Sequence, residues 1–250
     1  NMSRIWSCGF ELQSTTELEG LAVSNVAIST AIKASGEASA RFNPNNSTGD
    51  SVFVKHIAST NIVFARTKIY IASMPTTDEC LILATANLSL DFFGVILLNQ
   101  NAQLELHGYN GSTFTKIGSN SATLNTGQWY TIELNVDSSG LNWSFAARVN
   151  GSVFANGTTN PAGGINQDGI VVGATFSEGN PGSADIYHYD IAINSDAGSV
   201  QDSWPGEGKI VHLKPNAAGD SNQWRQGSGT TADTNNYTFV DEVTPDDATT

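Results

Sequence analysis

Carboxylate pairs that could cleave a glycosidic bond are the first feature to look for in this sequence. Glycoside hydrolases on β-sandwich folds carry an acid and a nucleophile on one strand face, two residues apart. No Glu in the chain is followed two positions later by Asp. Glu17 and Glu19 have a suitable spacing but lie in a turn-like stretch, while Glu133 and Asp137 lie about 13 Å apart along a strand. The pattern does not favour a glycosidase.

Other catalytic motifs are also missing from the sequence. There is no Gly-x-Ser-x-Gly elbow, no P-loop, no dinucleotide-binding glycine fingerprint and no His-Glu-x-x-His zinc pair. The four histidines stand alone on separate predicted strands: His56, His107, His188 and His212. We therefore predict a protein that is not an enzyme, with no catalytic residue, no cofactor and no metal.

A calcium site is the alternative to the prediction of no metal, because sandwich proteins bind calcium through loop carboxylates and carbonyl groups. Six aspartates lie in or next to predicted turns: Asp50, Asp78, Asp168, Asp185, Asp190 and Asp196. None of them forms an Asp-x-Asp-x-Asp-Gly loop. The sequence therefore leaves calcium open without naming a site.

Aromatic side chains on a strand face offer a different chemistry, since their rings can stack on the apolar faces of sugars. Strict alternation along residues 185–194 directs one set of side chains to the core, namely Tyr187, Tyr189, Ile191 and Ile193. The opposite face then holds Ile186, His188, Asp190 and Ala192. Along residues 129–136 the same rule leaves Trp129, Thr131 and Glu133 outside the core.

These faces predict a glycan-binding groove if the strands that carry them are neighbours. Its residues would be Arg66, Tyr70, Trp129, Glu133, His188 and Asp190. The alternative is that they are ordinary residues of the second face of a sheet, packed or solvated.

The elements that must position these residues are predicted to be β-strands throughout. Apolar or alternating runs rich in Val, Ile, Phe and Tyr recur between Gly, Asn, Asp and Ser clusters, and no segment shows a sustained helical period. The predicted strands cover residues 4–12, 26–32, 38–42, 51–57, 62–73, 80–86, 92–99, 102–107, 113–117, 129–137, 141–149, 170–176, 185–194 and 209–213. We expect an all-β fold, an antiparallel two-sheet jelly-roll sandwich.

Turn signals support hairpin connections between these strands. Asn110-Gly111, Asn150-Gly151, Asn156-Gly157 and Asp168-Gly169 can each supply positive φ in a tight hairpin. We divide the chain into a jelly roll over residues 1–200 and an extended C-terminal arm, or the start of a further β domain, over residues 201–250.

Composition and charge exclude two classes of partner. Charged residues make up 14% of the chain, compared with about 25% in ordinary soluble proteins, and the net charge is −13. Without a run of Lys or Arg, the chain lacks the electrostatic footprint for phosphate backbones or anionic lipids. We predict no nucleic-acid partner and no membrane partner.

The two cysteines, Cys8 and Cys80, cannot form a four-ligand metal site. No basic segment followed by an apolar one opens the chain, so no signal peptide is visible. We therefore expect two buried, reduced thiols, with a single disulfide as the alternative.

Several segments resemble a known family. Residues 127–136, 147–151 and 185–194 resemble the concanavalin A-like (laminin G-like) jelly roll. Residues 4–12 resemble the start of bacteriophage virion structural proteins that carry this domain, and residues 204–216 are similar to the segment that lies after the domain in those proteins. In such relatives two consecutive aspartates precede the Ile-Ala-Ile-Asn strand, whereas Tyr189 replaces the first here, which argues against a ligand role for Asp190.

The resemblance implies a non-enzymatic protein on the surface of a phage virion: a capsid decoration protein, a head fibre or a tail-associated protein. Its partners would be other virion proteins, copies of itself in a homo-oligomer, and a glycan. It would assemble in the host cytoplasm and become extracellular after lysis. The alternative function is a lectin-like carbohydrate-binding module used for attachment to a host.

The C-terminal arm is predicted to stabilise an assembly more than it stabilises its own jelly roll. Four large aromatic residues would be costly to leave in water: Trp204, Trp224, Tyr237 and Phe239. Prolines keep the segment extended, which suits a strap laid on a neighbouring molecule. The alternative is that the arm folds back on its own sandwich and covers a sheet edge.

Overall fold

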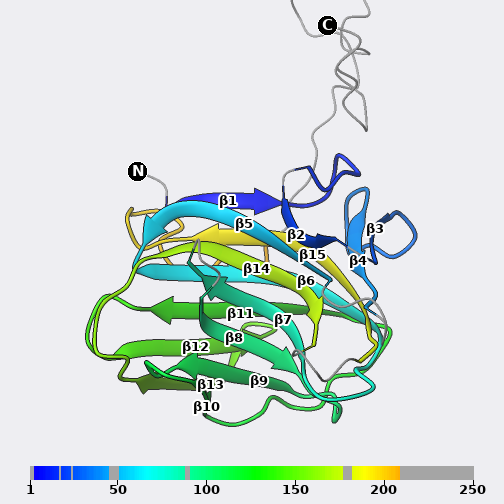
Figure 1. The fold of residues 1–250 in the computed structure, drawn as a ribbon. Helices are drawn as coiled ribbons and strands as arrows, with labels where there is room; N and C mark the ends of the chain where they lie inside the picture. Colours follow the sequence, from blue (N-terminus) through cyan, green and yellow to red (C-terminus); the bar gives the residue numbers. More distant parts are fainter. Residues whose placement is uncertain are drawn as a thin grey trace, which may run out of the picture.

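The computed structural model describes residues 3–16, 18–23, 25–44, 51–87, 91–176 and 182–208. Within these residues every regular element is a β-strand (Figure 1). The strands are β1 (Arg4–Cys8), β2 (Glu19–Val23), β3 (Val26–Ser29), β4 (Ser39–Phe42), β5 (Ser51–Thr60), β6 (Ile62–Ser73), β7 (Cys80–Ala86), β8 (Phe92–Leu98), β9 (Leu104–Tyr109), β10 (Phe114–Ile117), β11 (Trp129–Asp137), β12 (Trp143–Val149), β13 (Ser152–Thr159), β14 (Gln167–Thr175) and β15 (Asp185–Asn194). The described part of the chain contains no helix that could span a membrane.

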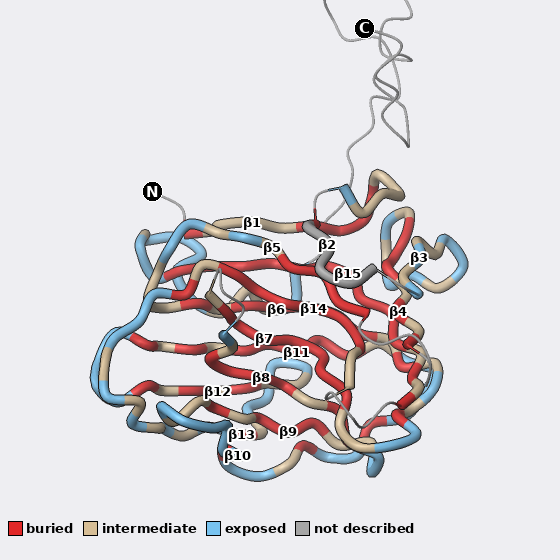
Figure 2. The backbone as a smooth tube through the Cα atoms, in the orientation of Figure 1, coloured by how far each residue is buried: buried red, intermediate tan, exposed pale blue. Residues whose placement is uncertain are grey.

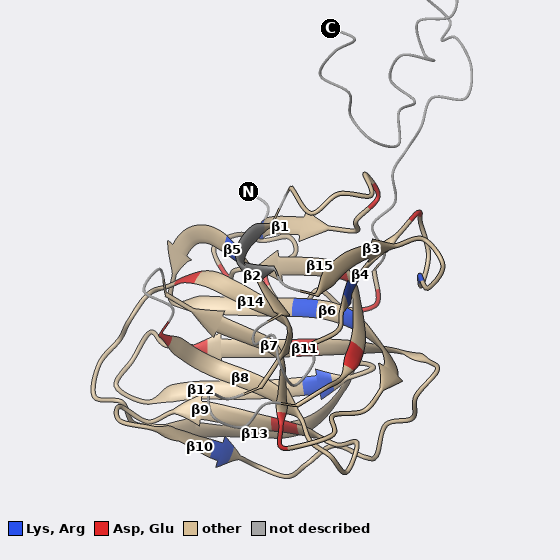
Figure 3. Ribbon diagram, turned by 45° about the vertical axis from the view of Figure 1, so that its right-hand side comes forward, with Lys and Arg blue, Asp and Glu red and all other residues tan. Residues whose placement is uncertain are grey.

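The strands form two sheets that pack face to face. The first sheet has the order β13-β12-β11-β6-β15-β4-β3, with β1 paired to β15. The second has the order β10-β9-β8-β7-β14-β5-β2, and the pairings in both sheets are antiparallel. This arrangement confirms the predicted all-β, antiparallel two-sheet sandwich. Charged residues are few and scattered over its strands (Figure 3).

Two of the strands, β2 and β13, were not predicted from the sequence. β13 is an edge strand of the first sheet, and beyond Val153, Phe154 and Ala155 its sequence is polar, so it lacks the sustained apolar alternation of a half-buried strand. β2 pairs with β5 at an edge of the second sheet. The predicted strand over residues 209–213 lies outside the described residues.

The hairpin signals were partly correct. Asn150 and Gly151 have φ values of 49° and 78° and join β12 to β13, and Gly111, with φ of 100°, lies between β9 and β10. In contrast, Asn156-Gly157 lies inside β13 and Asp168-Gly169 inside β14, so the prediction of turns there was wrong. Both dipeptides are accommodated because their strands are irregularly paired: the register shifts near each of them.

The core lies between the two sheets, where the buried residues of the strands face one another (Figure 2). Phe145 of β12 reaches from the first sheet toward the second and is 2% exposed. A Cβ atom on Gly108 of β9 would lie 2.9 Å from this ring, and one on Gly94 of β8 would lie 2.6 Å from Val136. Glycine at these two positions therefore allows the sheets to approach closely.

Cys8 and Cys80 form no disulfide in the described structure and both are buried, as predicted. Cys8 ends β1 and Cys80 begins β7. Burial raises the pKa of the Cys80 thiol to about 12, which keeps it protonated and unreactive at neutral pH.

His188 is a polar residue that links the two sheets inside the core. Its Nε2 lies 2.9 Å from the carbonyl oxygen of Gly173 in β14, and its Nδ1 lies 3.0 Å from Thr67 Oγ1. A neutral ring satisfies both contacts, with Nε2–H donating to Gly173 and Nδ1 accepting from Thr67. Burial lowers the pKa of His188 to about 4, so the ring is neutral in the folded protein at pH 7.

This buried histidine predicts a loss of stability in mild acid. The pKa of about 4 in the folded state lies below the ordinary value of 6.5, so between these pH values the unfolded chain binds a proton that the folded chain does not. The contribution of His188 is complete above pH 6.5 and is lost as the pH falls toward 4. From pH 7 to pH 5 we expect it to lower the free energy of unfolding by about 2 kcal/mol.

Urea denaturation at both pH values measures this loss. His188→Gln keeps a donor for Gly173 but cannot titrate, so its stability should change less between pH 7 and pH 5 than that of the wild type. His56→Gln alters an exposed histidine and serves as the control. An equal pH dependence in the wild type and His188→Gln would contradict the assignment.

Candidate functional site

Four side chains line up across the middle of the first sheet. Arg41 of β4 pairs with Tyr187 of β15, Tyr187 pairs with Tyr70 of β6, and Tyr70 pairs with Trp129 of β11. Directly opposed residues of antiparallel strands point to the same side of a sheet. Strands lie about 4.8 Å apart, so the four side chains span about 14 Å. We call Tyr187, Tyr70 and Trp129 the aromatic row.

The aromatic row lies on the outer face of the sheet, away from the core. The residues that alternate with it are part of the buried core between the sheets: Ile69, Ile71, Tyr130 and Ile186. Tyr187 is 6% exposed, whereas Tyr70 and Trp129 keep part of their surface in solvent. The two accessible rings therefore come from adjacent strands, β6 and β11.

Contacts between the rings fix the orientation of the aromatic row. Tyr70 meets Tyr187 edge-on at a centroid distance of 5.9 Å and meets Trp129 in a tilted contact at 5.6 Å. Trp129 also contacts Tyr189 edge-on at 6.1 Å. Tyr189 is completely buried and donates a hydrogen bond of 2.7 Å to Glu11 Oε1. These geometries are favourable for aromatic pairs and hold the exposed rings in place.

Two cations flank the aromatic row, and each is paired with an aspartate. Arg41 donates from Nε and Nη2 to the two carboxylate oxygens of Asp185, at 2.8 Å and 2.7 Å. The hydrogen bond to Asp185 is the main reason that the pKa of Arg41 is raised. Lys68, which pairs with Thr131 two residues after Trp129, lies 3.3 Å from Asp190 Oδ2.

Asp190 is the extra residue of a β-bulge in β15. The register with β6 shifts between Tyr189 and Ala192, and Asp190 has a φ of 49°. Aspartate is one of the few residues that enter this left-handed region at modest cost. Because of the bulge, the alternation of inward-facing and outward-facing side chains is shifted by one residue between the part of the strand before it and the part after it.

The bulge changes which residues of β15 face outward. Tyr187 and Tyr189 lie on the outer face, whereas His188 points into the core toward β14. The prediction of strict alternation along the whole strand wrongly placed Tyr187 and Tyr189 in the core and His188 outside it. Asp190 is itself completely buried.

The structure thus brings together only part of the predicted groove. Arg66, Tyr70, Trp129 and Glu133 lie on one face of β6 and β11, where Arg66 pairs with Glu133. His188 does not belong to this face because it points into the core, and Asp190 is completely buried in the bulge next to it. Sequence reasoning missed Tyr187 and Tyr189, but one signal was present. Ile186 and Ile191 are five positions apart, so both can face the core only if the strand contains an extra residue.

A C-terminal segment covers the part of the face next to the aromatic row. Asn194 Nδ2 donates to the carbonyl oxygen of Ser203 at 2.6 Å, and Arg66 Nη1 donates to that of Gly206 at 2.7 Å. The backbone N–H of Gly206 donates to Glu133 Oε1 at 2.7 Å. We call residues 203–207 the strap.

Side chains of the strap add further contacts with the same sheet. The guanidinium carbon of Arg148 lies 3.9 Å from the ring centroid of Trp204, and Phe64 meets this ring edge-on at 5.6 Å. Thr131 Oγ1 donates to Glu207 Oε2 at 2.9 Å. Cation–π contacts and hydrogen bonds of this kind stabilise the folded state.

The strap removes two groove residues from solvent. Arg66 and Glu133 are each 1% exposed. Burial is the main reason that the pKa of Glu133 is raised, and Glu133 Oε2 has no hydrogen-bond partner among the residues that the structure describes. The accessible part of this face is therefore the aromatic row rather than the charged residues next to it.

The strap also bears on the predicted assembly arm. Of the four aromatic residues named for that arm, Trp204 packs on the outer face of the protein's own first sheet, so this part of the arm folds back, onto a face of the sandwich and not onto a sheet edge. Trp224, Tyr237 and Phe239 lie outside the described residues. The role of residues 209–250 in an assembly stays a prediction.

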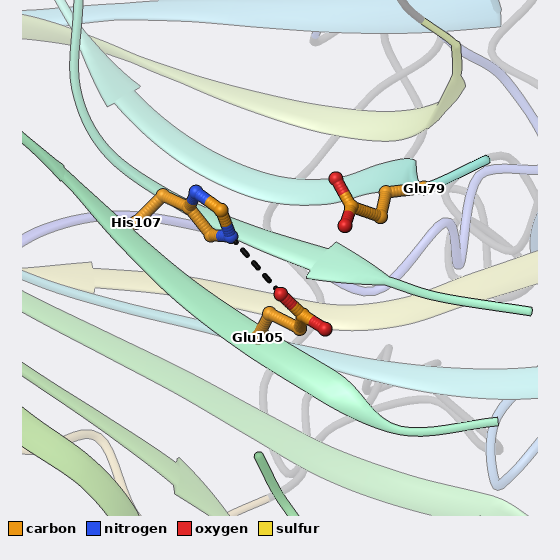
Figure 4. A group of neighbouring side chains, drawn as sticks. All are labelled: Glu79, Glu105 and His107. Carbon is orange, nitrogen blue, oxygen red and sulfur yellow. Dashed lines mark hydrogen bonds and ion pairs between the residues drawn. The ribbon is translucent and has the colours of Figure 1, made fainter. Parts of the chain in front are cut away.

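A second cluster of ionisable groups lies on the other sheet (Figure 4). In the described part of the chain, Glu79, Glu105 and His107 bring three potential metal ligands within 4.8 Å of one another. Glu105 Oε2 lies 3.2 Å from His107 Nε2 and 3.0 Å from Lys116 Nζ. Glu105 Oε1 accepts hydrogen bonds from Asn99 at 2.7 Å and from Asn120 at 3.1 Å.

Glu105 is thus fully engaged by protein groups. Its burial would raise the pKa of the carboxyl, but the hydrogen bonds from Asn99, Lys116 and His107 outweigh this effect and lower the pKa to about 2. Lys116 already supplies the positive charge that a metal ion would bring. The cluster holds β9 against β10, and a histidine ligand does not fit the oxygen-only preference of calcium.

Comparison with known proteins extends the description of the fold. No family model matches the sequence, and no curated protein does. The solved structure of Cip1, a cellulose-induced protein, is similar with a TM-score of 0.57 and 17% identity, over 76% of this chain and 97% of Cip1.

Two binding domains of toxins are similar to a lesser degree. The binding domain of Paraclostridial Mosquitocidal Protein 1 has a TM-score of 0.54 and 14% identity, over 77% of this chain and 48% of the other. The ligand-binding domain of botulinum neurotoxin serotype D, solved in complex with N-acetylneuraminic acid, has a TM-score of 0.52 and 13% identity, over 77% and 47%. The chain spans about half the length of these two relatives. At such identities the likeness shows a shared β-sandwich fold.

The contacts of the strap predict that Trp204→Ala destabilises the isolated protein. Truncation of a fully buried tryptophan costs 3–5 kcal/mol, and Trp204 is partly buried, so we expect a fall of about 2 kcal/mol in the free energy of unfolding. Thermal or urea denaturation of the monomer measures it.

Leu141→Ala is the matched control, because Leu141 is 68% exposed and its truncation should change stability by less than about 0.5 kcal/mol. If Trp204→Ala left monomer stability unchanged but abolished self-association, the strap would serve an assembly instead.

Proposed function

We propose that this protein is a carbohydrate-binding module whose ligand stacks on Trp129 and Tyr70. The observation that carries the proposal is the aromatic row: two partly exposed rings held by Tyr187 and Tyr189 on the outer face of a sheet. Sugar rings present apolar C–H faces that pack on aromatic rings and hydroxyl groups that hydrogen-bond at their edges. Both requirements are met where polar groups border the row.

The polar border of the aromatic row includes Arg41 and Asp185, which lie at one end of the row and are joined by two hydrogen bonds. A few oriented polar groups around an apolar surface are typical of sites that bind small ligands. The row is open at the surface, which suits reversible binding of an extended glycan.

The fold supports the same proposal. Two of the similar structures are binding domains, and one of them was solved with N-acetylneuraminic acid bound. Cip1 is named for its induction by cellulose. A binding function without catalysis agrees with the burial of Glu133, whose Oε1 accepts a hydrogen bond from the backbone of the strap.

A virion setting for this module remains a separate proposal. It rests on the resemblance of residues 4–12 and 204–216 to phage structural proteins, and the similar structures do not bear on it. Virion partners, a homo-oligomer and exposure on the particle surface belong to the same proposal. Labelling of purified particles with an antibody against this chain, viewed by electron microscopy, would test it.

The proposal predicts that Trp129→Ala weakens glycan binding by at least about ten-fold. Removing one stacked ring exposes apolar surface of the sugar and loses about 1.5–2 kcal/mol, which corresponds to this factor. Glycan arrays and affinity electrophoresis in polysaccharide gels measure the effect. Tyr70→Ala should behave similarly, whereas Tyr70→Phe keeps the ring and should lose less.

Phe114→Ala is the control for a surface aromatic residue, because Phe114 is 38% exposed and belongs to β10 of the other sheet. If Phe114→Ala weakened binding and Trp129→Ala did not, the ligand would bind the other sheet. If the wild type retained no glycan or polysaccharide at all, the proposed function would be wrong.

A further inference from the structure

The charges beside the aromatic row are already neutralised by the protein. Arg41 could otherwise bind the carboxylate of an acidic sugar, since its planar guanidinium group matches a carboxylate with two parallel hydrogen bonds. Asp185 occupies that position, with two hydrogen bonds of 2.7–2.8 Å. The same guanidinium group lies 5.8 Å from the ring centroid of Tyr187, so the ion pair is part of the site's border.

Lys68 is the second cation beside the row, and its partner is fixed by the fold. Asp190 is completely buried in the bulge, 3.3 Å from the Lys68 ammonium group. The backbone carbonyl oxygen of Asp190 accepts a hydrogen bond of 3.1 Å from Arg66 Nε, which holds the bulge in place. The carboxylate that pairs with Lys68 is therefore held in place by the fold.

An acidic sugar would meet two obstacles at this surface. The charge of Arg41 is already balanced by Asp185, so its remaining N–H groups attract a second carboxylate only weakly, and that carboxylate would lie next to Asp185 as a like charge. A neutral sugar meets neither obstacle, because the paired Arg41 and Asp185 can still exchange hydrogen bonds with hydroxyl groups at their free lone pairs and N–H groups.

We propose that the aromatic row selects neutral glycans and that Asp185 is the residue that determines this specificity, by neutralising Arg41. This inference rests on the proposed function and adds the class of ligand to it. Of the two aspartates, Asp185 is the one that can be substituted with less effect on the fold, because its side chain is 16% exposed and it begins β15 instead of lying in the bulge.

The test compares affinities for pairs of glycans that differ only in one carboxylate. Suitable pairs are array glycans with and without a terminal N-acetylneuraminic acid, and neutral oligosaccharides with their C6-oxidised uronic acid forms. We expect the wild type to bind the neutral member at least about ten-fold more tightly. Asp185→Asn should raise the ratio of acidic to neutral affinity by about three- to ten-fold, because it frees the charge of Arg41.

Two controls separate a local effect from a change in net charge. Asp91→Asn removes one negative charge from an exposed position next to β8 of the other sheet and should leave the ratio as in the wild type. The double variant Arg41→Gln/Asp185→Asn should lose the gain of the single variant. High salt should reduce the gain, since it screens exposed charges.

The outcomes distinguish this inference from the proposed function. If the wild type binds glycans through Trp129 but prefers the carboxylated members, or if Asp185→Asn does not change the ratio, the inference is wrong and the proposed function stands. If the wild type binds neither class, both are wrong.

Discussion

The bulge at Asp190 is the constraint on which the rest of the first sheet depends. β15 lies in the middle of that sheet, between β6 and β4, and also pairs with β1. Ile186 and Ile191 must both be buried although they are five residues apart, so one residue has to be left out of the alternation. Asp190 takes this place at positive φ, held by Lys68 and by Arg66. The two tyrosines before it consequently support the exposed rings of the aromatic row.

The strap divides the outer face of this sheet into two parts with different roles. Next to the bulge, Arg66 and Glu133 are sealed beneath residues 203–207 and contribute to folding. Buried charges of this kind must be paired and hydrogen-bonded, and the backbone of Gly206 provides both a donor and an acceptor for them. Beyond the strap, Tyr70 and Trp129 remain accessible. The contacts that stabilise the fold and the proposed binding surface therefore use neighbouring residues of the same two strands.

Much of the fold could be predicted from residue patterns, whereas the site could be predicted only in part. Alternation along β11 correctly placed Trp129 outside the core, and the predicted groove residue Tyr70 lies on the same face, directly opposite it. The same rule failed in β15, because a bulge inserts a residue without changing the local composition. β13 was missed since it is an edge strand whose three apolar residues are consecutive and do not alternate with polar ones. The strap depends on hydrogen bonds of its backbone to residues about 70 and 140 positions away, which no local pattern records.

The most direct test of the central claim is an NMR titration of the tryptophan indole N–H signals with a neutral oligosaccharide selected on a glycan array. Three of the five tryptophans report on different places: Trp129 lies in the aromatic row, Trp204 in the strap, and Trp143 is completely buried in the core. We predict that the Trp129 signal shifts in a saturable manner while that of Trp143 stays in place. A saturable shift of another indole signal with Trp129 unchanged would contradict the account, because the glycan would then bind elsewhere.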